Sequence, residues 1–264
     1  MFTAVADQID VVTVSTPDHM HFPIAVEAIK RGKPVMVQKP LCNTLWEARA
    51  LANYAKEKNV LTVMGNQGAT MQGTRILREW IESGMIGDVT EVNYWTNRPI
   101  WPQGHGLEFP AEPVPDTINW DVWQGTCATD HPYSPKIHPF AWRGFWDYGC
   151  GALGDIGCHS FNSAFWALDL MGDFIVEASK VYPRVVGGPT QELCRAIRGE
   201  GPKPVSNFID HAGPLTEMVL AGNLAVRLGK KIDWDMQNME ARGLPEVKAM
   251  LKRVYRAGWE PDLT

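Results

Sequence analysis

Three side chains in this sequence are of the types that proton transfer and charge stabilisation require. Lys39 follows the apolar run 34–37, and an ammonium group at the end of a buried strand is costly unless it meets an anion, a hydroxyl or a cofactor. Asp155 and His159 are four residues apart, so they share one face if the segment is a helix. On spacing alone, a surface pair or a core histidine with satisfied hydrogen bonds explains Asp155 and His159 better than catalysis does.

Polar loops follow two of the predicted strands. Residues 15–21 come directly after the β-branched run 10–15, and residues 38–43 come after the run 34–37. Ligands in open α/β sheets bind outside the carboxyl ends of the strands. We therefore expect these two loops to lie beside one ligand site.

Strands and helices alternate over the first 70 residues. The sequence predicts strands at 10–15, 34–37 and 60–64, a helix with Pro23 in its first turn that ends at Gly32, and a helix at 45–58. Thr44 and Glu47 have the spacing of a capping box at the start of the second helix. This alternation with short connections predicts an α/β fold with a doubly wound parallel sheet.

The rhythm changes after residue 70. We expect helices at 73–83, 154–170 and 215–228, an extended segment at 89–96 and a strand at 173–182. Residues 97–140 are rich in Pro, Gly, Trp and His, and a loop of that length is uncommon unless it is functional, so it forms either a wall of the substrate site or an oligomer arm. The sequence predicts a partial Rossmann domain at 1–70 and an α+β open-sheet substrate domain at 71–264.

The order and spacing of these motifs resemble the Gfo/Idh/MocA family of NAD(P)-dependent sugar and polyol oxidoreductases. Residues 16–21 are similar to the T-P-x-x-x-H stretch of that family, and Gln38-Lys39-Pro40 resembles its E-K-P motif with glutamine in place of glutamate. The segment Gly154-Asp155-Ile156-Gly157-Cys158-His159 resembles its G-D-x-x-x-H motif. Single motifs of this kind are moderately specific, whereas their joint order and spacing are hard to obtain by chance.

The resemblance implies a set of roles. His159 is expected to take the hydroxyl proton of the substrate, Lys39 to stabilise the same oxygen, and Asp155 to orient the imidazole or join the proton relay. Contacts to NAD or NADP are expected from Ser15, Thr16, Pro17, His19, His21, Gln38, Lys39 and Pro40. Arg143, Trp146 and Asp147 are candidates for substrate hydroxyls, although loop packing and a structural ion pair explain them equally well.

The resemblance is incomplete at two places. A family member is expected to open with a strand, a glycine-rich G-x-G-x-x-G turn and a later acidic residue, and this sequence starts at Met1 without that unit. After residues 181–182 the family continues through more strands, so the second domain is expected to be shortened near 182–188. We therefore expect these 264 residues to bind NAD(P) poorly and to have weak dehydrogenase activity or none.

Composition narrows the class of partner. The net charge of −5, with 25 basic and 30 acidic residues, gives no reason to expect nucleic acid. No apolar run approaches the ~20 residues that span a bilayer, so we expect a cytoplasmic protein with no membrane partner. The five cysteines are an odd number without a Cys-x-x-Cys pair, which predicts reduced structural thiols and no metal site. The expected partners are a small sugar or polyol and further copies of the chain, joined through the C-terminal sheet.

Three other functions remain open. A redox-assisted NAD-dependent glycosidase or lyase would use the same residues and cofactor to release a glycosidic bond. A non-enzymatic remnant would keep the fold without the reaction. A metal hydrolase built on His159 and Asp155 is disfavoured, because no second ligand pair has the spacing that a metal requires.

Overall fold

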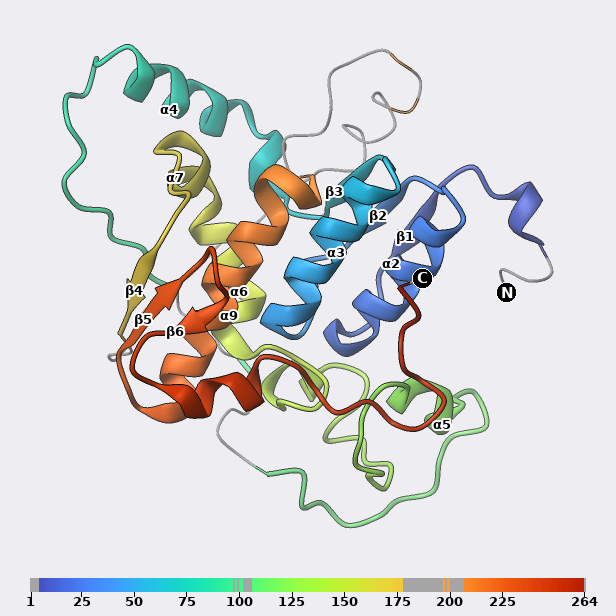
Figure 1. Cartoon of the computed structure of the whole chain (residues 1–264). Helices are drawn as coiled ribbons and strands as arrows, with labels where there is room; N and C mark the ends of the chain where they lie inside the picture. Colours follow the sequence, from blue (N-terminus) through green and yellow to red (C-terminus); the bar gives the residue numbers. More distant parts are fainter. Residues whose placement is uncertain are drawn as a thin grey trace.

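The computed structural model describes residues 5–96, 98, 100–101, 106–177, 197, 199 and 207–263. It confirms the predicted α/β class. A parallel sheet of three strands lies in the N-terminal part, and an antiparallel sheet of three strands lies toward the C-terminus (Figure 1). Between the two sheets the chain forms several helices and a long irregular segment.

The parallel sheet positions the loops that are predicted to border the ligand. Its strands are β1 (Val12–Val14), β2 (Val35–Val37) and β3 (Thr62–Met64), paired in the order β1-β2-β3. Val14 is opposite Val37, and Val37 is opposite Met64, so all three strands end at one level. The polar loops that follow them therefore leave from the same edge, as the sequence predicted.

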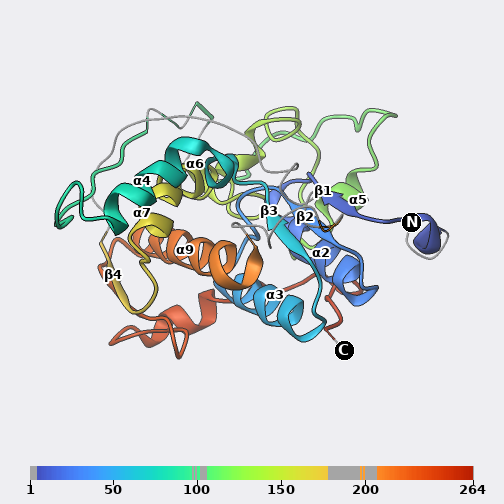
Figure 2. The ribbon, with the colours of Figure 1, turned by 90° about the horizontal axis from the view of Figure 1, so that it is seen from above.

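Helices α2 (His21–Lys30) and α3 (Leu45–Glu57) cover one face of this sheet (Figure 2). The capping box of α3 is confirmed. The Thr44 hydroxyl accepts the Glu47 amide N–H, and the Glu47 carboxylate accepts the Thr44 amide N–H. These bonds satisfy two amides that the first turn of a helix would otherwise leave without partners.

The C-terminal part contains the remaining regular elements. They are α4 (Gln72–Glu82), α5 (Trp120–Gln124), α6 (Gly151–Ser160), α7 (Asn162–Ala167), α9 (Gly213–Leu228), β4 (Phe174–Val176), β5 (Ile232–Asp235) and β6 (Glu240–Ala241). Short 3-10 turns lie at Ala6–Gln8, Asp18–Met20, Gln67–Thr70, Ala141–Gly144 and Pro245–Met250, and a π turn lies at Phe208–Ala212. No helix in the described ranges is both long and apolar enough to cross a bilayer.

Several predicted elements differ in detail. The helix expected at 154–170 begins earlier and divides at Phe161 into α6 and α7. The segment 89–96 forms no strand and its residues are mostly exposed. Of the strand expected at 173–182, the structure shows 174–176, while its end and the shortening expected near 182–188 lie outside the described residues.

One hydrophobic core joins the two parts of the chain. Helix α9 contacts α3 on one side and α6 on the other (Figure 2). The core includes Val37 and Leu51 from the N-terminal part together with Cys158, Leu215 and Val219 from the C-terminal part, all of them buried. The boundary predicted at 70/71 therefore crosses a shared core.

The irregular segment has a smaller core of its own. Its buried members are Trp120, Cys127, Tyr133, Ile137, Trp142, Phe145 and Tyr148. Trp120 and Trp123 stack with their ring centroids 4.6 Å apart, and Tyr133 meets Trp120 edge to face. Large aromatic side chains thus supply the packing that regular elements provide elsewhere in the molecule.

A buried ion pair connects α3, α9 and β5. Arg49 donates two hydrogen bonds to Glu217, at 3.0 and 2.7 Å, and the Trp234 indole N–H donates to the same carboxylate at 2.9 Å. The Glu217 side chain is only 1% exposed. Burial raises the pKa of Glu217, whereas the Arg49 cation lowers it.

Replacing Arg49 with methionine should lower the free energy of unfolding by about 3–5 kcal/mol, because it leaves a buried carboxylate without its cation. Urea unfolding followed by circular dichroism measures this difference. Lys230→Met is the matched control, because Lys230 and its partner Glu246 are both about half exposed. The control should leave the unfolding midpoint unchanged. Equal effects of the two substitutions would show that the buried pair does not hold these elements together.

Candidate active site

Gln38 and Lys39 begin the loop at the carboxyl end of β2. The Gln38 amide N–H donates to the Val14 carbonyl at 2.9 Å, which continues the pairing of β1 with β2 by one residue. The Gln38 side chain lies against Gly65, where an added Cβ would be 2.8 Å from Gln38 Cδ. Glycine at 65 therefore leaves room for the glutamine at this edge of the sheet.

Lys39 meets the carboxylate of Asp155 from helix α6. The Lys39 ammonium donates a hydrogen bond to Asp155 Oδ1, and Arg143 Nε lies 3.5 Å from the same oxygen. The side chain of Asp155 is 7% exposed and that of Lys39 is 17% exposed. A largely buried carboxylate thus lies between two cations, and these cations stabilise its ionised form inside the protein.

His159 lies one helical turn after Asp155. Its Nδ1 atom is buried and has no hydrogen-bond partner among the described residues. Burial lowers the pKa of His159 to about 4, and the Lys39 cation acts in the same direction, whereas Asp155 opposes it. The imidazole is therefore neutral at pH 7, and an unpartnered nitrogen of this kind is suited to bind a substrate hydroxyl.

Asp18 is a member of this cluster that the sequence did not single out. It is 3% exposed, and its carboxylate accepts the Cys150 amide N–H at 3.0 Å, just before the first turn of α6. Burial raises the pKa of Asp18 to about 7, while the Lys39 cation lowers it and Asp155 raises it. The available signal was its position between Thr16 and His19, in a loop already predicted to border the ligand.

The contact between Asp18 and the Cys150 amide bears on whether the start of α6 can bind a phosphate. Residues 149–154 have the glycine spacing of a dinucleotide-binding turn, but no strand precedes them. The N-terminal end of a helix attracts an anion. At α6 the Asp18 carboxylate already meets that end.

His19 and His21 brace the loop after β1. The two ring nitrogens of His19 lie 3.3 Å from the Tyr148 carbonyl oxygen and 3.0 Å from that of Trp123. Those of His21 lie 2.8 Å from the carbonyl oxygens of Pro40 and Thr16. Burial lowers the pKa of His19 to about 3 and that of His21 to about 4. Both rings therefore engage backbone carbonyls and position the loop.

The remaining cofactor candidates lie at the same edge. Ser15 is exposed, Thr16 and Pro17 are half-buried, and Pro40 is buried beside His21. Thr16 Oγ1 and Gln67 Oε1, which follow β1 and β3, are buried without a hydrogen-bond partner among the described residues. Buried polar atoms of this kind are costly unless a ligand or water satisfies them. This edge therefore fits the polar groups of a bound nicotinamide cofactor.

The three residues predicted to bind substrate, Arg143, Trp146 and Asp147, make different contacts. Arg143 joins the cluster through Asp155, as described above. Trp146 is 43% exposed, and the Arg227 guanidinium lies 5.6 Å from its ring centroid. Asp147 instead faces His131, with 2.6 Å between Oδ2 and Nε2. Only Arg143 contacts the residues expected to carry the chemistry.

A groove of about 1310 Å³ borders this cluster without containing it. Its lining includes Arg98, Trp146, Ala152 and Ile156, but neither Lys39, Asp155 nor His159. Arg98 and the start of α6 connect the groove to the cluster, because the Arg98 cation also lowers the pKa of His159. We assign the chemistry to the buried polar cluster, since the groove wall is mainly apolar.

Comparison with protein families matches both parts of the chain. Residues 2–66 match a family model described as "Oxidoreductase family, NAD-binding Rossmann fold". Residues 73–178 match the model described as "Oxidoreductase family, C-terminal alpha/beta domain". The two matches follow each other with a gap of only a few residues.

Curated relatives include two sugar dehydrogenases. A levoglucosan dehydrogenase from Pseudarthrobacter phenanthrenivorans is 27% identical over 201 residues, which are 74% of this chain and 43% of that protein. A D-xylose 1-dehydrogenase (NADP⁺) from Haloarcula marismortui is 25% identical over 166 residues, which are 63% of this chain and 38% of that protein. The chain thus spans less than half the length of these two relatives.

Solved structures share the fold. The WlbA dehydrogenase from Bordetella pertussis, solved in complex with NADH and UDP-GlcNAcA, superposes with a TM-score of 0.61 at 14% identity. The match covers 89% of this chain and 83% of that one. At this identity the likeness establishes a common architecture.

The buried histidines predict a loss of stability in acid. His19, His21, His159 and His211 have pKa values lowered from 6.5 to between about 3 and about 4. The unfolded chain therefore binds more protons below pH 6.5, and each net proton lowers the free energy of unfolding by about 1.4 kcal/mol per pH unit. Asp18 acts in the opposite direction, because the folded protein holds its proton up to about pH 7.

Urea unfolding at pH 7 and at pH 5.5 measures this balance, and the midpoint should be lower at pH 5.5. His211→Gln removes one of the four histidines and should reduce the stability difference between the two pH values by about 1 kcal/mol, because an unfolded-state histidine takes up most of one proton over this range. A midpoint that stays constant or rises on acidification would show that these histidines are protonated in the folded protein.

Proposed function

Because the chain belongs to the Gfo/Idh/MocA family of NAD(P)-dependent oxidoreductases, we propose that it oxidises a secondary alcohol of a sugar, glycoside or polyol with hydride transfer to a nicotinamide cofactor. The observation that carries this proposal is the contact of Lys39 with Asp155 beside the unpartnered Nδ1 of His159. These groups come from the end of β2 and from α6, which are distant in sequence.

Each side chain has a distinct part in the proposed reaction. The neutral His159 accepts the hydroxyl proton, and Lys39 stabilises the negative charge that develops on the substrate oxygen. Asp155 holds the Lys39 ammonium in position and favours the protonated form of His159. A bound nicotinamide supplies the hydride acceptor for this chemistry.

We propose that the cofactor and the substrate both bind at the carboxyl edge of the parallel sheet. We propose that Ser15, Thr16, Pro17, Gln38 and Pro40 border NAD or NADP, and that His19 and His21 position that border. Arg143 is placed to bind a substrate hydroxyl, and Trp146 offers an exposed ring for a sugar to stack on. The two curated sugar dehydrogenases support a sugar as the substrate class.

The antiparallel sheet is the surface through which we propose that copies of the chain associate. Among the described residues, strand β4 lies at the edge of that sheet, and its Ile175 is 61% exposed. An exposed sheet edge with an apolar side chain favours pairing with another chain. Light scattering of Ile175→Lys against the unchanged protein tests this association.

Replacing His159 with alanine should lower kcat about 10²–10⁴-fold, because the reaction loses a positioned base. Lys39→Ala should lower kcat and kcat/KM together, since it removes charge stabilisation in the transition state. The assay follows nicotinamide reduction at saturating NAD⁺ or NADP⁺ with a panel of pyranoses and polyols. His138→Gln, in the irregular segment, is the control for changing a histidine.

Three outcomes would count against this assignment. Near-normal turnover by His159→Ala removes His159 from the mechanism, and a change in Lys39→Ala confined to KM makes Lys39 a binding residue only. Release of a glycosidic leaving group, found by chromatography of the products, would favour the redox-assisted glycosidase. Because weak cofactor binding is expected of the 264 residues by themselves, the same variants are also made in a longer relative with the same motifs, where no turnover and no cofactor binding would favour a non-enzymatic role.

We expect the 264 residues, tested by themselves, to bind dinucleotide weakly. The pyrophosphate is usually held by a glycine-rich turn between a strand and a helix, and neither β1, β2 nor β3 is followed by one. Titration calorimetry with NAD and NADP measures the affinity, and a thermal melt shows that the protein is folded. Micromolar binding by the folded protein would contradict this expectation.

A further inference from the structure

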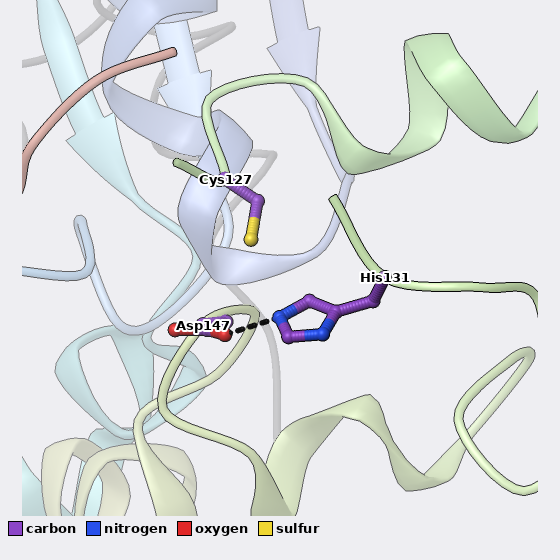
Figure 3. Close-up of side chains that lie close together, drawn as sticks. All are labelled: Cys127, His131 and Asp147. Atoms are coloured by element: carbon purple, nitrogen blue, oxygen red, sulfur yellow. Dashed lines mark hydrogen bonds and ion pairs between the residues drawn. The ribbon is translucent and has the colours of Figure 1, made fainter. Parts of the chain in front are cut away.

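Cys127, His131 and Asp147 converge in the irregular segment, away from the residues assigned to the reaction. The thiol, one imidazole nitrogen and one carboxylate oxygen all lie within 4.8 Å of one another. Figure 3 shows the three side chains pointing toward a common centre, with His131 bonded to Asp147. Cys127 and His131 lie on the loop that follows α5, and Asp147 lies on the turn before α6. Sulfur, imidazole nitrogen and carboxylate oxygen are the three donor types that zinc binds in proteins.

The backbone around these side chains is held firmly. The His131 amide N–H donates to Gln124 Oε1 at 2.7 Å, and the His131 carbonyl accepts the Trp120 indole N–H at 2.7 Å. The Cys127 amide N–H donates to the Gln124 carbonyl at 2.9 Å, and Cys127 is 2% exposed. Helix α5 therefore positions both residues.

Asp147 is held by a contact from the C-terminal segment. Its carbonyl accepts a hydrogen bond from Arg253 at 3.1 Å, while its side chain is 41% exposed. The backbone is thus tied to the rest of the chain, and the carboxylate remains free to turn toward a ligand. The cluster has one buried donor, Cys127, and two half-buried donors, His131 and Asp147.

We propose that Cys127, His131 and Asp147 bind a zinc ion, with a solvent molecule as the fourth ligand. Tetrahedral zinc, with its usual bond lengths, holds its ligand atoms about 3.3–3.7 Å apart. Starting from 2.6 Å between His131 and Asp147, the carboxylate moves outward by less than about 1 Å to admit the ion. The Cys127 thiol gives its proton to solvent as the sulfur–zinc bond forms.

The electrostatics of the cluster agree with a cation at its centre. Burial, followed by the Asp147 charge, raises the pKa of Cys127 to about 11, and the divalent ion would neutralise both the thiolate and the carboxylate. The Tyr148 hydroxyl interacts with the thiol in the direction that favours the thiolate. The Arg253 cation opposes a second cation, but its effect on Cys127 ranks below that of Asp147.

The position of the site indicates a structural role. The ligands belong to a segment whose core is mainly aromatic and which contains little regular structure. Zinc would join the loop of Cys127 and His131 to the turn of Asp147 and would stabilise them as a covalent cross-link does. Because Tyr148 and Trp123 contact His19, this bracing would extend to the loop at the end of β1.

The test uses the 264-residue protein, stripped with a chelator and then dialysed against zinc. Elemental analysis should find one zinc per chain, and cobalt should give a near-ultraviolet thiolate-to-metal charge-transfer band. Cys127→Ser and His131→Gln should lose the metal, and Cys127→Ser should also lose the cobalt band. His138→Gln, a histidine of the same segment outside the cluster, should keep both.

Stability gives a second readout that does not depend on the folding of a variant. Zinc at about 100-fold above its Kd should raise the Tm of the unchanged protein by about 5–10 °C. Asp147→Asn, at the most exposed of the three ligands, should reduce that shift. A folded protein that binds no zinc would overturn the proposal and leave a hydrogen-bonded His131–Asp147 pair. Full zinc binding by Cys127→Ser would overturn it as well, because the metal would then lie elsewhere.

Discussion

The buried carboxylate of Asp155 between the Lys39 ammonium and the Arg143 guanidinium is the contact on which the site depends. An ionised carboxylate in this position is stable only while its cations stay close, so their positions are coupled. Lys39 comes from the end of β2, whereas Asp155 and Arg143 belong to α6 and the turn before it. The same ion pair therefore fixes the parallel sheet against α6 and places His159 at the edge of the sheet.

The surrounding structure fixes the loops that adjoin this contact. Asp18 bonds to the amide before α6, and His19 reaches the carbonyls of Trp123 and Tyr148 in the irregular segment. The irregular segment is thus connected to the loop after β1 through the His19 imidazole and through the His19 backbone, which bonds to Thr126 and Tyr148. A change in the irregular segment can therefore alter the edge proposed for the cofactor without touching any residue assigned to the reaction.

The sequence predicted the fold where local patterns determine it. The three parallel strands and the capping box at Thr44 depend on periodicity and short spacings, and the structure confirms both. The meeting of Lys39 and Asp155 was expected because a family motif identified both residues. Asp18 was missed because its burial depends on Cys150, 132 residues later in the chain. The cluster of Cys127, His131 and Asp147 was missed because irregular loops bring it together, and such loops leave no periodic signal.

The core shared by α3, α6 and α9 shows that a domain defined by family matches differs here from a domain defined by packing. The family matches divide the chain at residues 66 and 73, which marks two modules that evolution has inherited together. Packing draws no line there, because Leu51 from the first matched module and Cys158 and Phe165 from the second belong to the same buried core. Cooperative unfolding follows buried contacts rather than ancestry. The modules are therefore units of descent, whereas the shared core predicts that both unfold together.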